Sequence, residues 1–339
     1  MKYGRRGFLA AAFSTGLALT FGITGAWGAR KIARHRQIAP SKTLVRSRSA
    51  PLKSARTALV PFQTAPFPYH GMIPGTHTPF LNVDENGRKG HRTGSGRVYW
   101  EDQTYNDNRV LLHIPKGFDI RRPALMLVFF HGHGATLERD VLDRQKVPAQ
   151  ISASNANVVL VAPQLAVDAR DSSAGKFWQP GAFGRFIGEA GQQLARLQGD
   201  RKSLRTFASM PIIIVAYSGG YVAAASAIER GGLKKRVRGV VLLDSLYGDL
   251  DKFANWIEGD PSAFFVSAYL NSTRNQNARL EDILAAHDVD VSPVINTRLA
   301  SGGATVLRGG SGRHRDLVTH AWVDYPIIDI LKRLPEYRR

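Results

Sequence analysis

The chain has 339 residues, 43% of them hydrophobic, and a formal net charge of +19 at pH 7. This composition is typical of a folded protein with one large domain or two small ones, and it excludes a disordered chain. Cysteine is absent from the sequence, which excludes disulfide bonds, a thiolate nucleophile and Cys-ligated zinc or iron–sulfur sites.

Residues 1–28 have the pattern of an export signal. Positive charge at the start is followed by an uncharged stretch that runs to Trp27 and ends in small residues. The pair Arg5-Arg6, followed by Gly-Phe-Leu, resembles the bacterial twin-arginine export motif. The uncharged stretch is also long enough to span a bilayer, so it is either a cleaved signal peptide or a retained anchor. We therefore expect an exported protein in the periplasm, free or anchored to the inner membrane.

The excess of positive charge lies mostly at the N-terminus. The first 57 residues contain 12 Lys or Arg and no Asp or Glu. Residues 29–67 are rich in Arg, Lys, Ser, Ala and Pro and are predicted to be a linker before a folded domain at 68–339. The basic segment is either a solvated linker or a contact for an anionic membrane or cell-wall surface. No basic helix with interleaved aromatic residues accompanies it, so no nucleic-acid partner is expected.

From about residue 95 onward, apolar runs alternate with amphipathic segments. Continuous apolar runs are typical of strands that are buried on both faces of a parallel sheet. Strands are predicted at 109–114, 125–130, 158–162, 212–216 and 240–243, with weaker candidates at 264–266 and 305–307. Helices are predicted at 183–197, 219–230, around 280–284 and at 316–334, where Pro326 kinks or splits the last one. This alternation predicts an α/β fold with a doubly wound, mostly parallel sheet, which binds ligands at the carboxyl ends of its strands.

The strand predicted at 212–216 is followed at once by Ser218, Gly219 and Gly220 and then by an Ala-rich helix. A reversal from strand to helix without a loop strains Ser218 and exposes its hydroxyl at the edge of the sheet. Small residues at Ala216 and Gly220 allow the strand and the helix to approach closely. The arrangement resembles the G-x-S-x-G nucleophile elbow of the α/β-hydrolase superfamily, with alanine in place of the first glycine. The alternative is that Ser218 only caps the helix.

The resemblance also implies an oxyanion hole. In that family, a His-Gly turn after an early central strand supplies one backbone amide, and here the strand at 125–130 ends in such a turn. The residues implied are Gly219 on one side and Gly132, His133 and Gly134 on the other, with His133 or Gly134 as the donor. His131 is expected to be a structural, hydrogen-bonded residue. His131 and His133 have no third ligand nearby in the sequence, so we expect no metal and no cofactor.

A histidine base is expected to complete the site, because a serine nucleophile needs a proton acceptor. In the family, the base follows the last strand and precedes the last helix. This position implies His314, in the loop after the strand at 305–307. His320, six residues further on and inside the predicted helix, is the alternative.

An orienting acid is expected as well. In the family it usually follows the seventh strand, but no carboxylate follows the run at 264–266. Some members use an acid after the sixth strand, which implies Asp244 here, with Asp249 and Asp251 as alternatives. Asp244 could instead only cap the following helix. The order Ser218, Asp244, His314 matches the family order of serine, acid and histidine.

The sequence therefore predicts an exported serine hydrolase that cleaves an ester, or an amide, through an acyl-enzyme intermediate. Its substrate is expected to be a small molecule or an acyl component of the cell envelope. Trp178, Phe177, Phe183 and Tyr247 are candidates to line an acyl pocket. The alternative function is a non-catalytic binding protein of the same fold, tethered at the cell envelope.

Overall fold

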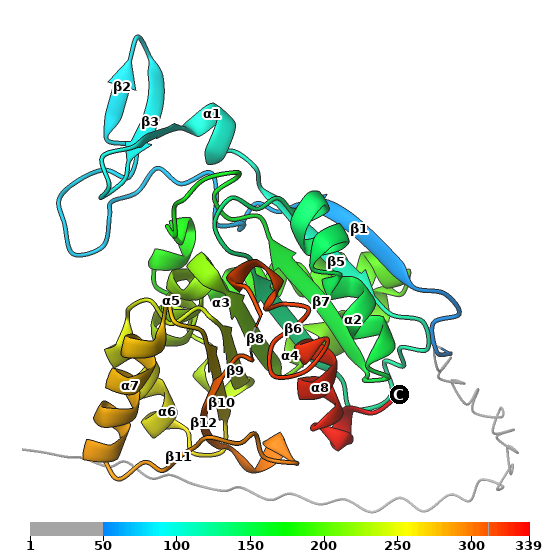
Figure 1. Cartoon of the computed structure of the whole chain (residues 1–339). Coiled ribbons are helices and arrows are strands. Elements are labelled where there is room, and N and C mark those ends of the chain that lie inside the picture. The colour runs from blue at the N-terminus through cyan, green and yellow to red at the C-terminus, as the bar shows by residue number, and fades with distance from the viewer. Residues whose placement is uncertain (1–49, 311) are drawn as a thin grey trace, which may run out of the picture. The chain divides into compact units, whose positions relative to one another are not determined.

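A computed structural model describes residues 50–310 and 312–339, and within them nine strands form one central sheet (Figure 1). Their order is β1-β5-β7-β6-β8-β9-β10-β12-β11. The strands are β1 (Arg56–Pro61), β5 (Arg109–Ile114), β6 (Leu125–Phe130), β7 (Val158–Pro163), β8 (Ile212–Tyr217), β9 (Val237–Leu243), β10 (Phe264–Tyr269), β11 (Val291–Ser292) and β12 (Gly303–Arg308). All neighbours from β7 to β11 pair in parallel, whereas β5 pairs antiparallel with both β1 and β7. This topology confirms the mostly parallel α/β sheet predicted from the sequence.

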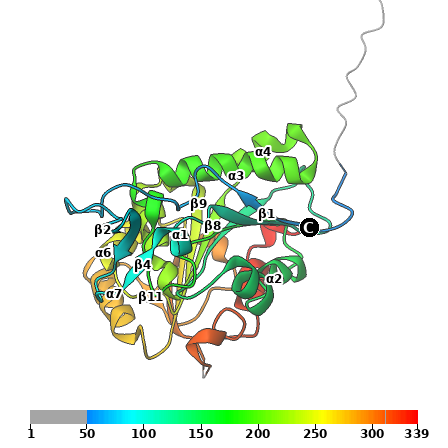
Figure 2. The ribbon, with the colours of Figure 1, turned by 90° about the horizontal axis from the view of Figure 1, so that it is seen from above.

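Helices cover both faces of the sheet. They are η1, a π-helix (Leu137–Arg144), and the α-helices α2 (Val147–Ala153), α3 (Ala182–Gln198), α4 (Leu204–Ser209), α5 (Tyr221–Arg230), α6 (Leu250–Gly259), α7 (Arg274–Ala286) and α8 (Pro326–Lys332). Side chains of α3 to α7 share one apolar core with alternate strand residues, and those of η1, α2 and α8 share the other. Figure 2 shows α3 and α4 on one side of the strands and α2 on the opposite side. Every residue of β6 and β8 is buried, which explains why the sequences of these strands are continuously apolar.

Short 3-10 turns connect several of these elements. They are η2 (Gly175–Trp178), η3 (Arg201–Ser203), η4 (Ser218–Gly220), η5 (Lys234–Arg236), η6 (Leu299–Ser301), η7 (His314–Asp316) and η8 (Pro335–Tyr337). Two of them lie beyond the carboxyl ends of parallel strands, where ligands are expected: η4 follows β8 directly, and η7 begins at His314, after β12 has ended at Arg308.

The prediction of a linker at 29–67 is wrong for residues 50–67, the part that the structure describes. Residues 56–61 form β1, which pairs along its whole length with β5, and Phe62 is completely buried in the core. The folded domain therefore begins near residue 50, not at Pro68. The sequence concealed β1 because an edge strand is only half covered, so its apolar pattern is weak. The remainder of the predicted linker, the export signal and the candidate anchor lie outside the described residues.

Residues 68–95, for which the sequence suggested no role, form together with residues 96–105 a small insertion that packs against the loop after β7. It contains β2 (Val83–Glu85), β3 (Arg88–Arg92) and β4 (Val98–Trp100) in one antiparallel sheet, followed by α1 (Glu101–Thr104). An aromatic cluster of Phe67, Tyr69, Phe80 and Tyr105 joins it to Ala166 and Ala169. The insertion thereby supports the segment 164–178, in which Ser172 lines the same pocket as Ser218.

The helix predicted at 316–334 is correct only in its second half. Residues 317–325 form turns, and α8 begins at Pro326, because proline is favoured in the first helical turn and lacks the amide that an earlier turn would need. Among the described residues, no helix has the length and apolar character needed to cross a membrane.

Candidate active site

Ser218 lies at a tight reversal between β8 and α5. Its backbone φ is +52°, in the left-handed region that side chains rarely adopt. A Cβ atom on Gly220 would lie 2.6 Å from the carbonyl oxygen of Phe130, so glycine is required there. The Ser245 hydroxyl donates a 2.7 Å hydrogen bond to the carbonyl oxygen of Ser218 and fixes the turn. The strained turn is the geometry expected of a nucleophile elbow, and Ala216 is completely buried in β8.

A chain of two hydrogen bonds joins Ser218, His314 and Asp244. The Nε2 atom of His314 lies 2.8 Å from Oγ of Ser218, and its Nδ1 atom lies 2.6 Å from Oδ2 of Asp244. A carboxylate can only accept, so the imidazole donates from Nδ1 and is left with a lone pair on Nε2 for the serine proton. The structure thus brings together the three residues that the sequence indicated for catalysis.

Asp244 is completely buried at the end of β9. Its Oδ1 accepts hydrogen bonds from the Leu270 amide (3.0 Å) and the Thr273 hydroxyl, and its Oδ2 accepts from Ser272 (2.5 Å) and from His314. Burial raises the pKa of Asp244, but these hydrogen bonds, led by that from His314, outweigh burial and lower the pKa to about 2. The carboxylate is therefore ionised and oriented at neutral pH.

The alternative site residues lie elsewhere. Asp249 immediately precedes α6 and forms an ion pair with Lys252 at 2.9 Å, and Asp251 is exposed in the first turn of that helix. His320 lies in a turn, not in a helix as predicted, and its nearest carboxylate is Asp324 at 3.8 Å. In the part of the chain that the structure describes, none of the three forms a hydrogen bond or ion pair with Ser218 or His314.

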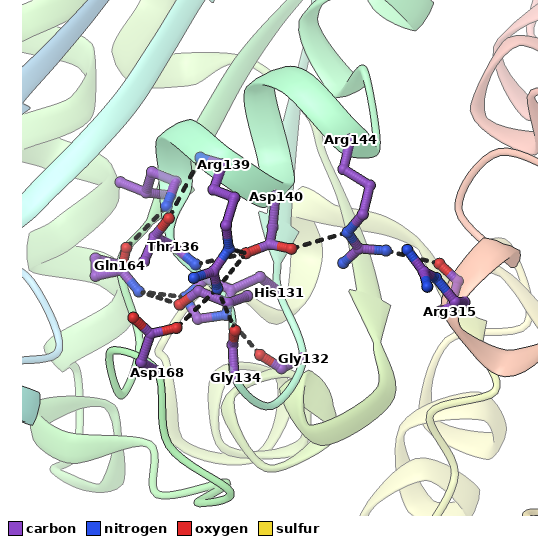
Figure 3. A network of polar contacts seen from close by, with 12 residues as sticks. His131, Gly132, Gly134, Thr136, Arg139, Asp140, Arg144, Gln164, Asp168 and Arg315 are labelled. Atoms are coloured by element: carbon purple, nitrogen blue, oxygen red, sulfur yellow. Dashed lines mark hydrogen bonds and ion pairs between the residues drawn. The ribbon is translucent and has the colours of Figure 1, made fainter.

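Two contacts hold the turn that carries His314. The Tyr217 hydroxyl donates to the carbonyl oxygen of His314 at 3.1 Å, and the two rings stack with centroids 5.1 Å apart. One residue further on, Nη1 of Arg144 donates to the carbonyl oxygen of Arg315 at 2.7 Å (Figure 3). Arg144 is itself held through Nε by Asp140 at 2.8 Å. The turn is therefore fixed from both the nucleophile elbow and η1.

Asp140 is the buried centre of the network drawn in Figure 3. Besides Arg144, it accepts hydrogen bonds from the Thr136 amide (2.9 Å) and from Nε of Arg139 (3.0 Å). Burial raises the pKa of Asp140, but the bonds from Thr136, Arg144 and Arg139 outweigh burial and lower it. Arg139 continues the network to the carbonyl oxygen of Gly134 and to Asp168. One carboxylate thus ties the segment 134–144 to the turn of His314.

The turn after β6 contains two alternative candidates for an oxyanion donor, the amides of His133 and Gly134. The Gly134 amide donates to the carbonyl oxygen of Ala169 at 2.9 Å, which leaves His133 as the candidate of the two. The His133 amide has no partner among the described residues, and it lies in a segment that lines the same pocket as Gly219. The Gly219 amide lies in the first helical turn, where amides lack an intrahelical acceptor.

Gly132 and Gly219 provide the space that this site needs. A Cβ atom on Gly132 would lie 2.6 Å from Cβ of Ser218, and one on Gly219 would lie 2.4 Å from Cδ2 of His133. The His133 ring is positioned over Gly219 by a 2.7 Å hydrogen bond between its Nε2 and the Ser172 hydroxyl. Glycine at these two positions lets the turn after β6 approach the elbow.

His131 is structural, as predicted. It is completely buried, and its Nδ1 donates to the carbonyl oxygen of Gly132 at 2.8 Å while its Nε2 accepts from the Leu165 amide at 2.8 Å. Burial lowers its pKa to about 4, so the ring is neutral at neutral pH. Within residues 50–310 and 312–339, no cluster of three or more His, Asp, Glu or Cys side chains could hold a metal ion.

A pocket of about 640 Å³ opens beside Ser218. Its lining comprises His133, Arg144, Arg170, Ser172, Tyr217, Ser218, Gly219, Tyr221, Tyr247, His314 and Arg315. Of the aromatic residues proposed from the sequence, only Tyr247 lines it; Phe177 and Phe183 are core residues, and Trp178 lies by a neighbouring depression. The arginines and Tyr217 were not identified from the sequence, because they come from segments with no common local pattern.

Comparisons with known proteins find distant structural similarity alone. No protein-family model and no curated protein matches the chain. Among solved structures, it is similar to a feruloyl esterase module from Clostridium thermocellum, with 15% identity and a TM-score of 0.45 over 80% of this chain and 96% of that one. It is also similar to an S-formylglutathione hydrolase from Agrobacterium tumefaciens, with 10% identity and a TM-score of 0.43 over 76% and 97%. A thermostable esterase from Pseudomonas putida shares 14% identity, with a TM-score of 0.42 over 76% and 86%.

Proposed function

We propose that this protein is a serine hydrolase that cleaves carboxylic esters, or amides, through an acyl-enzyme intermediate. The observation that carries the proposal is the hydrogen-bonded chain from Ser218 through His314 to Asp244. A serine hydroxyl is a weak nucleophile unless a neighbouring base accepts its proton, and a base works best when an acid fixes its tautomer. Here the nucleophile, the base and the acid lie at the carboxyl ends of β8, β12 and β9.

The first chemical step follows from this geometry. Oγ of Ser218 attacks the substrate carbonyl carbon while Nε2 of His314 accepts its proton, which gives a tetrahedral oxyanion and an imidazolium. The ionised Asp244 accepts from Nδ1 and stabilises that imidazolium. The amides of Gly219 and His133 donate to the oxyanion, where each such donor is worth about 3 kcal/mol in the transition state.

The cycle then closes on the same residues. The tetrahedral intermediate collapses, the leaving alcohol or amine takes the proton from His314, and the acyl group stays on Ser218. Water enters, gives its proton to His314 and attacks the acyl carbon. Collapse of the second intermediate releases the acid, and the proton returns from His314 to Oγ of Ser218. The cycle therefore requires only the side chains and amides named above.

A fluorescent fluorophosphonate probe tests this proposal on the full chain and on its Ser218→Ala and His314→Ala variants. We expect labelling of the wild type, none of Ser218→Ala, and a loss of ester hydrolysis on the order of 10⁴-fold or more in either variant. A folded wild-type protein that is neither labelled nor active on any ester would favour the non-catalytic binding function instead. Retained hydrolysis in Ser218→Ala would exclude Ser218 as the nucleophile.

The proposal extends to an exported protein. It is supported by the charge pattern of residues 1–28 and by Arg5-Arg6, with an acyl component of the cell envelope as one class of substrate. Fractionation of cells that produce the wild type and the double variant Arg5→Lys, Arg6→Lys tests it. We expect periplasmic or inner-membrane protein from the wild type and cytoplasmic retention of the variant. A salt wash of the membrane fraction then separates surface contact through the basic segment from anchoring.

A further inference from the structure

The pocket beside Ser218 is lined by three arginines from three separate segments. Arg144 ends η1, Arg170 lies in the loop after β7, and Arg315 lies in η7. No Asp or Glu is among the lining residues, and the nearby carboxylate of Asp244 is completely buried behind His314. Because no lining carboxylate offsets their charge, the three arginines make the electrostatic potential in the pocket positive.

Two of these arginines already have partners. Nε of Arg144 donates to Asp140 at 2.8 Å, and its Nη1 donates to the Arg315 carbonyl oxygen. Nε of Arg315 lies 3.8 Å from Asp316, a long contact for a side chain that is mostly exposed. Arg144 is therefore largely committed to holding the His314 turn, whereas Arg315 retains most of its donor capacity.

Arg170 is the arginine without a counter-charge. Its guanidinium has no carboxylate partner in the part of the chain that the structure describes, although acidic residues stand two positions before it and one after it. Asp168 instead pairs with Arg139 at 2.7 Å. Asp171 instead accepts from the hydroxyls of Tyr105 and Ser173, each at 2.9 Å. Both neighbouring carboxylates are thus directed away, and the guanidinium remains free at the pocket.

We infer that the substrate of this site is an ester that carries an anionic group, such as a carboxylate, close to its scissile bond, and that Arg170 binds this group with help from Arg315. This inference rests on the proposed function and names its substrate class. A guanidinium presents a rigid fork of donors that matches a carboxylate, and such charge-assisted hydrogen bonds are stronger than neutral ones. The hydroxyls of Tyr221 and Tyr247, which line the same pocket, add uncharged donors.

Matched pairs of aryl esters test the inference on the full chain. The 4-nitrophenyl monoester of adipic acid is compared with its methyl ester, which places the charge on the acyl part. The acetyl ester of 4-hydroxybenzoate is compared with that of methyl 4-hydroxybenzoate, which places the charge on the alcohol part. For at least one pair, we expect kcat/KM to favour the anionic member by tenfold or more, with a preference that shrinks as NaCl is added.

Two variants identify which arginine binds the anionic group of the substrate. We expect Arg170→Gln to lower the ratio of anionic to neutral kcat/KM about tenfold, which corresponds to one charge-assisted contact, and Arg315→Gln to lower it less. Arg205→Gln is the control, because it removes the same charge from an exposed position in α4, before the amino end of β8 and at the opposite edge of the sheet. It should leave the ratio unchanged.

Each result has a separate meaning. A wild-type ratio near or below one for both pairs, or a ratio that Arg170→Gln leaves unchanged, overturns the inference but not the proposed function, provided that Ser218 is still labelled. If Ser218 is labelled but no ester turns over, protection against the probe by monomethyl adipate and by dimethyl adipate is compared, and equal protection overturns the inference. If Ser218 is not labelled and no ester is cleaved, the proposed function fails and the inference fails with it.

Discussion

The Tyr217 hydroxyl donates a 3.1 Å hydrogen bond to the main-chain oxygen of His314, and its ring stacks on the imidazole. The residue immediately before Ser218, the proposed nucleophile, therefore holds His314, the proposed base. Burial raises the pKa of Tyr217 to about 12, so its hydroxyl remains a donor over the whole physiological range. Tyr217 thus helps to hold His314 in place beside Ser218.

Replacement of the Tyr217 hydroxyl should show whether this residue positions His314 or binds the substrate. Tyr217→Phe keeps the stacked ring and removes one hydrogen bond, worth about 1 kcal/mol. We expect kcat for a neutral ester to fall about fivefold with little change in KM, because the base is less well held in the transition state. Steady-state kinetics measure both constants. A changed KM with an unchanged kcat would indicate that Tyr217 contacts the substrate instead.

Substitution of the two candidate acids should give opposite results. Asp244→Asn keeps the shape but favours the wrong tautomer of His314, so kcat should fall on the order of 10⁴-fold. Asp249→Asn is the matched control, since asparagine tolerates the φ of +58° at that position and Asp249 does not contact His314. We expect it to retain activity within a factor of two. Equal losses in both variants would show that Asp244 is not the orienting acid.

Stability should depend on Asp244 in acid. Its pKa is about 2 in the folded protein and 3.8 as a free side chain, so its ionised form stabilises the fold above about pH 4 and this contribution disappears as the pH falls toward 2. The shift corresponds to about 2 kcal/mol. Urea unfolding of the wild type and Asp244→Asn at several pH values tests this. The free energy difference should be largest near pH 7 and shrink below pH 4, and a difference that is independent of pH would contradict it.

Substitution of the neighbouring glycines Gly219 and Gly220 should affect activity and stability differently. The Cβ of Gly219→Ala meets the movable His133 ring, whereas that of Gly220→Ala would lie 2.6 Å from the backbone oxygen of Phe130. We therefore expect Gly219→Ala to keep its melting temperature and lose about tenfold or more in kcat, as the oxyanion turn is displaced. Gly220→Ala should lower the melting temperature by several degrees, because backbone must shift. Thermal unfolding and kinetics of both variants make the comparison, and a reversed pattern would contradict it.

The features that the sequence by itself determined depend on residues that are close together in the chain. Strands buried on both faces appear as continuous apolar runs, and the elbow needs Ala216, Ser218 and Gly220 within five positions, so both could be predicted from neighbouring residues. β1 could not, because one side of an edge strand faces solvent and its pattern is diluted. The extent of the last helix could not either, because Pro326 is compatible both with a kink and with a helix start.

Only the tertiary structure decided between residues of the same type. Asp244, Asp249 and Asp251 stand close together in sequence, but only Asp244 lies at the end of β9, where the turn after β12 brings His314 to 2.6 Å. Of the two alternative donors to the proposed oxyanion, the Gly134 amide is already bound, because the carbonyl oxygen of Ala169, 35 residues away, accepts from it. Arg144, Arg170 and Arg315 form one positive pocket because the sheet places the ends of separate segments together. The role of a charged group or a hydrogen-bond donor depends on the groups next to it, and in this protein those neighbours come from segments that are far apart in the sequence.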